Sequence, residues 1–155
     1  TWPILQRPVL SYLERCPTTD DTPCVVPEGT TARVVMVGNP ALWWTMLAAL
    51  PLVAWQVVRR RDRALIGVLA LAASLYVPWL GLGRGYLFYL APLVPFAALA
   101  LVAGTRSLPG RAAQVAPWVV LAVAVALLGF LFPIWYGIPL DADATDARLL
   151  LDTWR

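Results

Sequence analysis

Four long stretches of this chain carry no charged residue, and this feature constrains the fold more than any other. Each stretch is long enough to cross the apolar core of a bilayer, which takes about 20 apolar residues. The stretches are Val34–Val58, Ala64–Gly83, Gly85–Thr105 and Ala112–Leu140. A chain of 155 residues cannot bury four such segments in a core of its own. The pattern therefore predicts an integral membrane protein.

Composition supports the same class. The chain is 60% hydrophobic and only 14% charged, whereas soluble domains carry about a quarter of charged residues. We predict an all-α integral membrane fold with four transmembrane helices over residues 38–58, 64–82, 86–105 and 115–136. Prolines within the spans predict kinks, because neighbouring helices can satisfy the freed carbonyl groups. These prolines are Pro51, Pro78, Pro92, Pro95, Pro117 and Pro133.

The loops predict the orientation in the membrane. Four arginines crowd the first break, at Arg59–Arg61 and Arg63, and Arg106 and Arg111 occupy the third. The positive-inside rule places both breaks in the cytoplasm. Residues 1–33 then form an exoplasmic loop and residues 137–155 an exoplasmic tail, in a multi-pass protein of the plasma membrane. The tail is either a short helix lying in the interface or a frayed end.

The chain lacks the residues that several functional classes require. The chain has no histidine and two cysteines, which cannot build an ordinary zinc site, and we expect no metal and no cofactor. The arginines form no stripe interleaved with exposed aromatic residues, so nucleic acid is not an expected partner.

Two cysteines flank a short polar loop. Cys16 and Cys24 fall on the side predicted to be exoplasmic, where thiols can oxidise. We predict a Cys16–Cys24 disulfide that shapes the loop, and two free thiols are the alternative.

Arg84 is the most specific candidate for a functional site. It is the only charged residue between Arg63 and Arg106, lies between Gly83 and Gly85, and is followed by aromatic residues that include Tyr89. Such an arginine can extend its side chain to the lipid headgroups. It can also bind phosphate through two parallel hydrogen bonds, with the glycines permitting close approach of the backbone. Both interpretations stand on the residues alone.

Several short sequence motifs of the chain resemble the C-terminal four-helix region of the protein O-mannosyltransferases, especially their bacterial branch. The most specific is Gly38-Asn39-Pro40 followed by Trp43-Trp44. The others are Arg7-Pro8-Val9, Val77-Pro78-Trp79, Arg84 with Phe88-Tyr89, Pro95-Phe96, Phe132-Pro133-Ile134, Ile138-Pro139, and Arg148 with Trp154. The resemblance covers residues 1–155. It departs at Ser11–Leu13, Leu140 and Leu149–Leu151.

The resemblance implies a lipid-donor glycosyltransferase. Such enzymes transfer mannose from a polyprenyl phosphate to Ser or Thr of exported proteins at the exoplasmic face. The donor lipid, acceptor secreted proteins and membrane lipids would be the partners. The family's catalytic acid lies in an exoplasmic loop upstream of this region, so no catalytic residue can be assigned here. Arg84 matches a family arginine, which favours the phosphate interpretation, with Tyr89 beside it.

Two other classes are compatible with the sequence. Proline-interrupted spans also line translocation paths, as in a lipid transporter or flippase, and a non-catalytic assembly scaffold is a further alternative. Transporters keep polar groups near the membrane midplane, and these spans offer only Thr45, Gln56 and Ser74.

Overall fold

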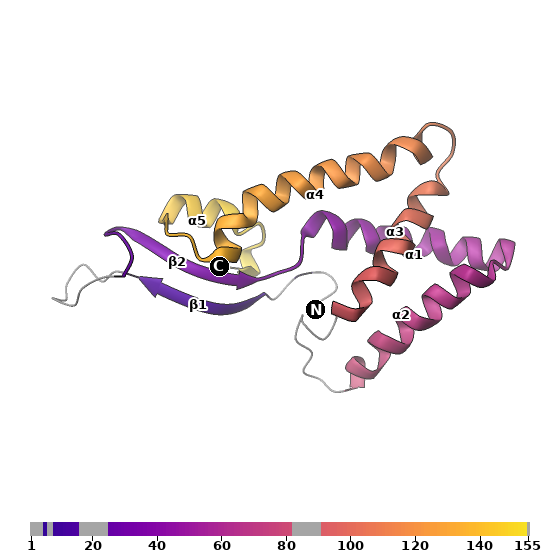
Figure 1. Ribbon diagram of the computed structural model, residues 1–155, viewed down its shortest axis with the longest axis horizontal. Coiled ribbons are helices and arrows are strands. Elements are labelled where there is room, and N and C mark those ends of the chain that lie inside the picture. Colours follow the sequence, from indigo (N-terminus) through magenta and orange to yellow (C-terminus); the bar gives the residue numbers. More distant parts are fainter. Residues whose placement is uncertain (1–4, 6–7, 16–24, 82–90, 155) are drawn as a thin grey trace. The chain divides into compact units, whose positions relative to one another are not determined.

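The computed structural model describes residues 5, 8–15, 25–81 and 91–154, except for the side chains of 79–81. The chain divides into two compact units (Figure 1). The first unit combines Thr1–Val37 with Ala126–Arg155, and the second is Gly38–Val125.

A three-stranded antiparallel sheet forms the centre of the first unit. Strands β1 (Val9–Arg15) and β2 (Thr30–Met36) lie side by side (Figure 1) and pair along their length. The short β3 (Leu140–Asp141) pairs with the start of β2. Residues 30–36 are rich in Thr and Val, which favour strands. The all-α prediction does not include this sheet, because an interrupted apolar pattern of seven residues is much weaker than that of a membrane span.

The register of β1 shifts between Leu10 and Tyr12. Leu10 pairs with Val35, whereas Tyr12 pairs with Val34, so Ser11 is the extra residue of a bulge. An inserted residue reverses the alternation of side chains between the two faces beyond it. Leu13 and later odd-numbered residues of β1 therefore share the face of Leu10.

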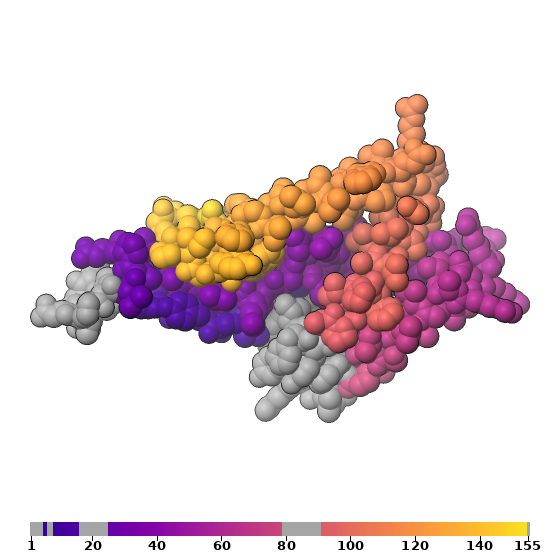
Figure 2. Space-filling model, viewed as in Figure 1, coloured from indigo at the N-terminus to yellow at the C-terminus, as the bar shows by residue number. Residues whose placement is uncertain are grey.

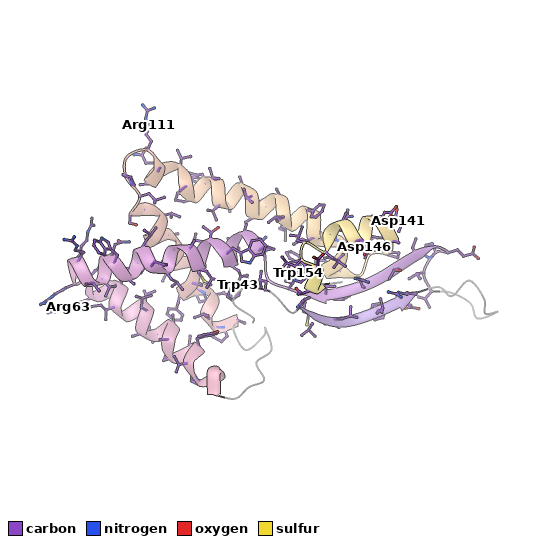
Figure 3. The ribbon with its side chains drawn as sticks, turned by 180° about the vertical axis from the view of Figure 1, so that it is seen from behind. Trp43, Arg63, Arg111, Asp141, Asp146 and Trp154 are labelled. Carbon is purple, nitrogen blue, oxygen red and sulfur yellow. The ribbon has the colours of Figure 1, made fainter. Side chains whose placement is uncertain are left out.

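The C-terminal tail folds onto this unit. Helix α5 (Ala142–Arg148) begins at Asp141, whose carboxylate accepts a hydrogen bond from the Ala144 amide at 2.6 Å. After the helix, Leu149 is buried, and the 3-10 helix η2 (Asp152–Trp154) buries Trp154 (Figure 3). The indole N–H of Trp154 donates to the carbonyl of Leu5 at 2.6 Å. The tail is thus an ordered part of the unit, and the frayed alternative is wrong.

The second unit contains three helices and the first part of a fourth. These are α1 (Pro40–Arg60), α2 (Arg63–Gly81), α3 (Val94–Arg106) and α4 (Ala112–Tyr136), whose last turns belong to the first unit. Helix α1 packs chiefly against α3. The two backbones approach closely at Gly104, where an added Cβ would lie 2.6 Å from the Cβ of Ala49. Small residues at such a contact are typical of helix packing in membranes.

Two of the helices are long and apolar enough to cross a bilayer. Helices α1 and α4 contain windows of mean hydropathy 1.6 and 2.6. Two further apolar helical segments are shorter, Arg63–Pro78 within α2 and Ala91–Arg106, which includes α3. The 13 residues of α3 span about 20 Å at 1.5 Å per residue, less than the roughly 30 Å of a bilayer core. The prediction of four spans is therefore supported for the first and fourth and stays a prediction for the others.

The prolines occupy two kinds of position. Pro51 and Pro78 lie inside α1 and α2, and Pro117 and Pro133 lie within the bounds of α4. Pro95 stands in the first turn of α3, where the missing N–H costs no hydrogen bond. Helix α3 begins at Val94, residues 86–90 lie outside the described part of the chain, and the predicted kinks stay predictions.

Candidate functional site

The start of α1 is built by three consecutive residues. Asn39 caps the helix, because its side-chain oxygen accepts from the Ala41 amide at 3.1 Å, and Pro40 occupies the first turn. The side-chain nitrogen of Asn39 donates to the carbonyl of Ala124, in α4, at 2.8 Å. One amide side chain therefore both begins α1 and joins it to α4.

Gly38 is required by the position of Trp43. A Cβ added at Gly38 would lie 2.0 Å from Nε1 of Trp43 and 2.4 Å from Cδ1. No side chain fits in that space, so only glycine lets the indole lie against the backbone that precedes α1. The Gly-Asn-Pro…Trp motif is therefore explained by one local packing arrangement at the start of α1.

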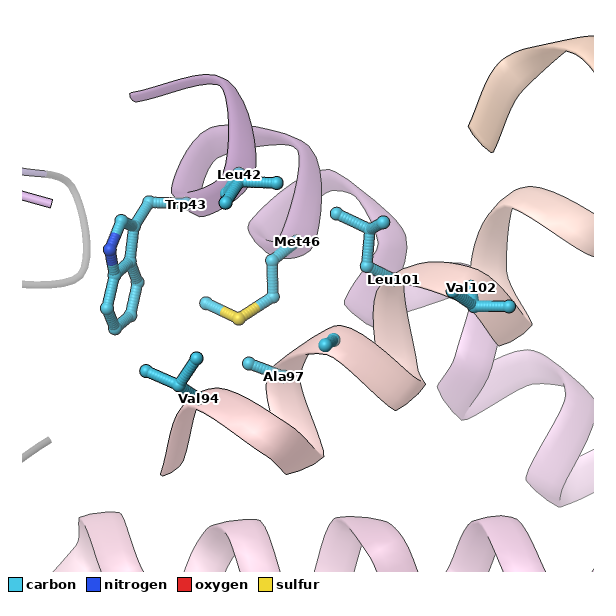
Figure 4. Close-up of a pocket in the computed structure, with 8 residues that line it drawn as sticks. Leu42, Trp43, Met46, Val94, Ala97, Leu101 and Val102 are labelled. Carbon is cyan, nitrogen blue, oxygen red and sulfur yellow. The ribbon is translucent and has the colours of Figure 1, made fainter. Parts of the chain in front are cut away.

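Trp43 also forms one wall of an apolar pocket between α1 and α3. Its volume is about 150 Å³. Figure 4 shows Trp43 and Met46 of α1 facing Val94 and Ala97 of α3. Leu101 and Val102 of α3 line the end farther from Trp43. A pocket with this lining can hold part of a hydrocarbon chain, and it offers no acid, base or nucleophile.

Three polar side chains within the helices hydrogen-bond to carbonyl groups of the helix backbone. The Gln56 amide donates to the carbonyl of Ala103 at 3.2 Å, which is a second link between α1 and α3. The hydroxyls of Ser74 and Thr105 donate to carbonyls of their own helices, at 2.8 Å and 2.9 Å respectively. Such bonds remove the cost of placing these groups in an apolar medium.

Positive charge gathers at the ends of α1 and α3. Arg59 and Arg60 lie in the last turn of α1, and Arg106 lies in the last turn of α3. The Arg59 guanidinium stands 4.5 Å from the ring centroid of Trp55. Figure 3 shows Arg63 and Arg111 toward the end of the second unit that is opposite Trp43. The two basic junctions, far apart in sequence, therefore belong to the same end of this unit.

Arg148 joins α5 to the C-terminal part of α4. Its Nε donates to the carbonyl of Phe130 at 3.0 Å, and its guanidinium carbon lies 5.2 Å from the centroid of the Phe130 ring. A second nitrogen donates to the carbonyl of Ala144 at 2.6 Å. Arg148 and Trp154, which carry part of the family resemblance, are thus structural residues of the tail.

The predicted site residues lie outside the described part of the chain. Arg84, Tyr89, Cys16 and Cys24 fall within residues 82–90 and 16–24. The lipid-phosphate site and the disulfide therefore stay predictions. Among the described residues, no group of three His, Cys, Asp or Glu side chains could hold a metal ion. The double role of Asn39 was not foreseen, although an Asn-Pro pair before an apolar run is a recognised start of a helix.

Exposed apolar helices define the class of protein. Only 17% of the apolar window in α1 and 11% of that in α4 are buried within the structure, whereas the core helix of a soluble protein is mostly buried. Figure 2 shows the side chains of α4 forming part of the surface along the helix. Apolar helices of this length, left uncovered by the chain itself, indicate a membrane protein.

Known proteins similar to this chain are mannosyltransferases. Over its whole length the chain is 29% identical to the polyprenol-phosphate-mannose–protein mannosyltransferase of Mycolicibacterium smegmatis (strain ATCC 700084 / mc(2)155). It is 28% identical to the protein of the same name from Mycobacterium tuberculosis (strain ATCC 25618 / H37Rv). The chain spans 31% of the length of each of these relatives. These similarities confirm the resemblance to the protein mannosyltransferases.

No protein-family model and no solved structure matches the chain.

Proposed function

We propose that this chain is the C-terminal membrane region of a polytopic glycosyltransferase. The enzyme would transfer mannose from a polyprenyl phosphate to Ser or Thr hydroxyls of exported proteins at the exoplasmic face of the plasma membrane. The observation that carries the proposal is similarity over the whole chain to mannosyltransferases of which it spans about a third. The catalytic acid would lie in another part of the enzyme, so this region would serve to bind the donor.

The apolar pocket between α1 and α3 supports a lipid donor. Its lining includes Trp43, Met46 and Leu101, and none of its lining residues carries a charge. A polyprenyl chain gains free energy by burying CH₂ and CH₃ groups, at about 25 cal/mol per Å² of apolar surface. We assign this pocket to part of that chain.

Arg84, with Tyr89 nearby, is proposed to bind the phosphate of the donor or product. Support comes from the isolation of Arg84 among uncharged residues, its glycine neighbours and its match to a family arginine. A guanidinium meets phosphate oxygens through two parallel hydrogen bonds, which an ammonium cannot reproduce.

The proposed orientation places both basic junctions in the cytoplasm and both ends of the chain outside. Their location at one end of the second unit agrees with it. This orientation puts the tail and the sheet on the side where the transfer would occur.

Arg84 supplies the test of the proposed function. In the full-length enzyme, Arg84→Ala should lower the rate of mannose transfer about 30- to 1,000-fold, the effect of losing roughly 2 to 4 kcal/mol of transition-state stabilisation. Arg84→Lys keeps the positive charge but loses the paired N–H donors of the guanidinium, so it should retain part of the transfer rate. The measurement is transfer of labelled mannose from polyprenyl-phosphate mannose to an acceptor peptide, with Arg111→Gln as the matched control. A normally folded Arg84→Ala enzyme with the rate of the unmodified protein would show that Arg84 only reaches the headgroups.

A transporter or a scaffold is less well supported. A transport path needs polar groups that are free to meet the substrate. Ser74 and Gln56 instead hydrogen-bond to helix carbonyls. The similar proteins are also named as transferases.

A further inference from the structure

A second pocket lies in the first unit, against the β1–β2 sheet. Its volume is about 280 Å³. Leu10 and Leu13 of β1 and Val35 of β2 supply its apolar floor, and Trp154 of η2 supplies a wall. The Trp154 indole is held in place by its hydrogen bond to Leu5. The pocket is therefore formed by residues from both ends of the chain.

Two arginines line this pocket, Arg15 from β1 and Arg33 from β2. Leu13 pairs with Arg33 and Arg15 pairs with Thr31, so the arginines are diagonal neighbours on one face of the sheet. Diagonal neighbours are about 7–8 Å apart, within reach of each other's long side chains. Like charges at this separation repel one another unless an anion lies between them.

The bulge at Ser11 produces this arrangement. Without the extra residue, regular alternation would put Glu14 on the face of Leu10 and send Arg15 to the other face. In the observed register Glu14 pairs with Ala32, on the opposite face from Arg33, and accepts a hydrogen bond from the Tyr12 hydroxyl. No carboxylate is among the described residues that line the pocket, and the remaining polar side chain is that of Thr153.

Arg33 provides an independent indication of a ligand. Its Nε is buried and has no hydrogen-bond partner among the described residues. A buried donor on a charged group is costly when unpaired, and in native structures such a group is satisfied by an ordered water, an ion or a ligand. The pocket thus presents two guanidiniums and a hydroxyl above an apolar floor.

We propose that this pocket binds a phosphate group carried on an apolar moiety, with Arg15 and Arg33 holding the phosphate. The guanidiniums supply paired N–H donors for the phosphate oxygens. Leu10, Leu13 and Trp154 contact the apolar part of the ligand. The site is defined by binding alone and does not depend on the proposed transfer reaction.

Equilibrium binding to the full-length protein tests the site, without acceptor peptide or mannose donor. The probes are a short isoprenyl monophosphate, inorganic phosphate, and the same isoprenol without phosphate, each measured by titration calorimetry in detergent or nanodiscs. Arg15→Gln and Arg33→Gln should each weaken binding of the isoprenyl monophosphate about tenfold or more, because a charge-assisted hydrogen bond is lost. Arg111→Gln, which changes an exposed arginine outside the pocket, should leave it unchanged.

The probes distinguish the source of the phosphate. Tight binding of the isoprenyl monophosphate with weak binding of inorganic phosphate identifies a lipid phosphate. Equal binding of both identifies a free phosphate or a headgroup. Tight binding of the isoprenyl monophosphate that depends on the two arginines supports the proposal. Equal binding of inorganic phosphate overturns the proposed contact with an apolar moiety, and isoprenol binding as tight as that of the isoprenyl monophosphate overturns the phosphate site.

The variants separate this proposal from that for Arg84. Arg15 is exposed, so Arg15→Gln remains informative even if Arg33→Gln fails to fold. Unchanged binding in Arg15→Gln overturns the site. If Arg84→Ala loses binding while Arg15→Gln and Arg33→Gln keep it, the site at Arg15 and Arg33 is overturned and the Arg84 assignment is supported. Failure of the Arg84 proposal would appear in the transfer rate and would leave binding by Arg15 and Arg33 intact.

Discussion

Single residues at the start of α1 make contacts beyond those needed to begin the helix. Asn39 satisfies one free amide of the helix and, with its other side-chain atom, donates to a carbonyl of α4. Gly38 is the residue that admits the Trp43 indole. A change at any of these positions therefore affects the contacts of a second element as well as its own.

Asn39 allows its two roles to be separated by substitution. Asn39→Ala removes both hydrogen bonds and should lower the free energy of unfolding by about 1 to 3 kcal/mol, the sum of a helix cap and an interhelical bond. Asn39→Asp keeps the capping oxygen but loses the N–H that donates to Ala124, so it should leave α1 intact and weaken only its link to α4. Thermal unfolding of the full-length protein in detergent measures both. An Asp variant as unstable as the Ala variant would mean that repulsion between its carboxylate and the Ala124 carbonyl costs as much as the cap contributes.

At the scale of elements, the α1–α3 pair is held by close approach of small residues. Ala49 and Ala100 are each 3% exposed, and Gly104 is in contact with Ala49. Dispersion between closely packed backbones and the Gln56 bond to α3 hold the pair together, and both act equally well in lipid, where helices gain no hydrophobic driving force. The apolar pocket beside Trp43 exists because this contact fixes the distance between the two helices.

Gly104→Ala tests the contact between α1 and α3. The new Cβ would meet the Ala49 Cβ at 2.6 Å, so the helices must separate, at a cost of about 1 to 3 kcal/mol in the free energy of unfolding. Gly67→Ala is the matched control, because a Cβ at Gly67 meets nothing within 4 Å in its helix α2. The melting temperature should fall for Gly104→Ala and stay level or rise for Gly67→Ala. Equal melting temperatures would contradict the close contact.

At the scale of the whole molecule, orientation in the membrane decides which pockets a substrate can reach. The first and fourth spans are supported by helices long enough to cross, and both basic junctions lie at one end of their unit. The proposed donor site can serve transfer at the exoplasmic face only in the proposed orientation.

Accessibility of single cysteines tests the orientation. With Cys16 and Cys24 replaced, a thiol at Arg60 should react with an impermeant reagent only after the cytoplasmic side is opened, whereas one at Asp143 should react in intact cells. Both native side chains are exposed. Asp62 is unsuitable as a probe position because its carboxylate accepts from the amides of Ala64 and Leu65 at the start of α2. Labelling of the Arg60 thiol in intact cells would reverse the topology.

The sequence by itself determined the apolar helices, because hydropathy and helix signals are local. The uncharged run after Asn39-Pro40 and the arginines near residue 60 define α1 closely, and the run that begins near Ala112 defines α4. The resemblance to mannosyltransferases was likewise present in short phrases of residues. None of these features depends on a distant partner.

Only the tertiary structure decided the sheet, its register and the pockets. Pairing of Thr31 with Leu140, or of Asn39 with Ala124, joins residues far apart in the chain, and no local pattern specifies such a partner. The bulge at Ser11 determines which face Arg15 shares with Arg33, yet a bulge is defined by the opposite strand. Side-chain identity is local and pairing is not, so the sequence supplied the arginines and the fold brought them together.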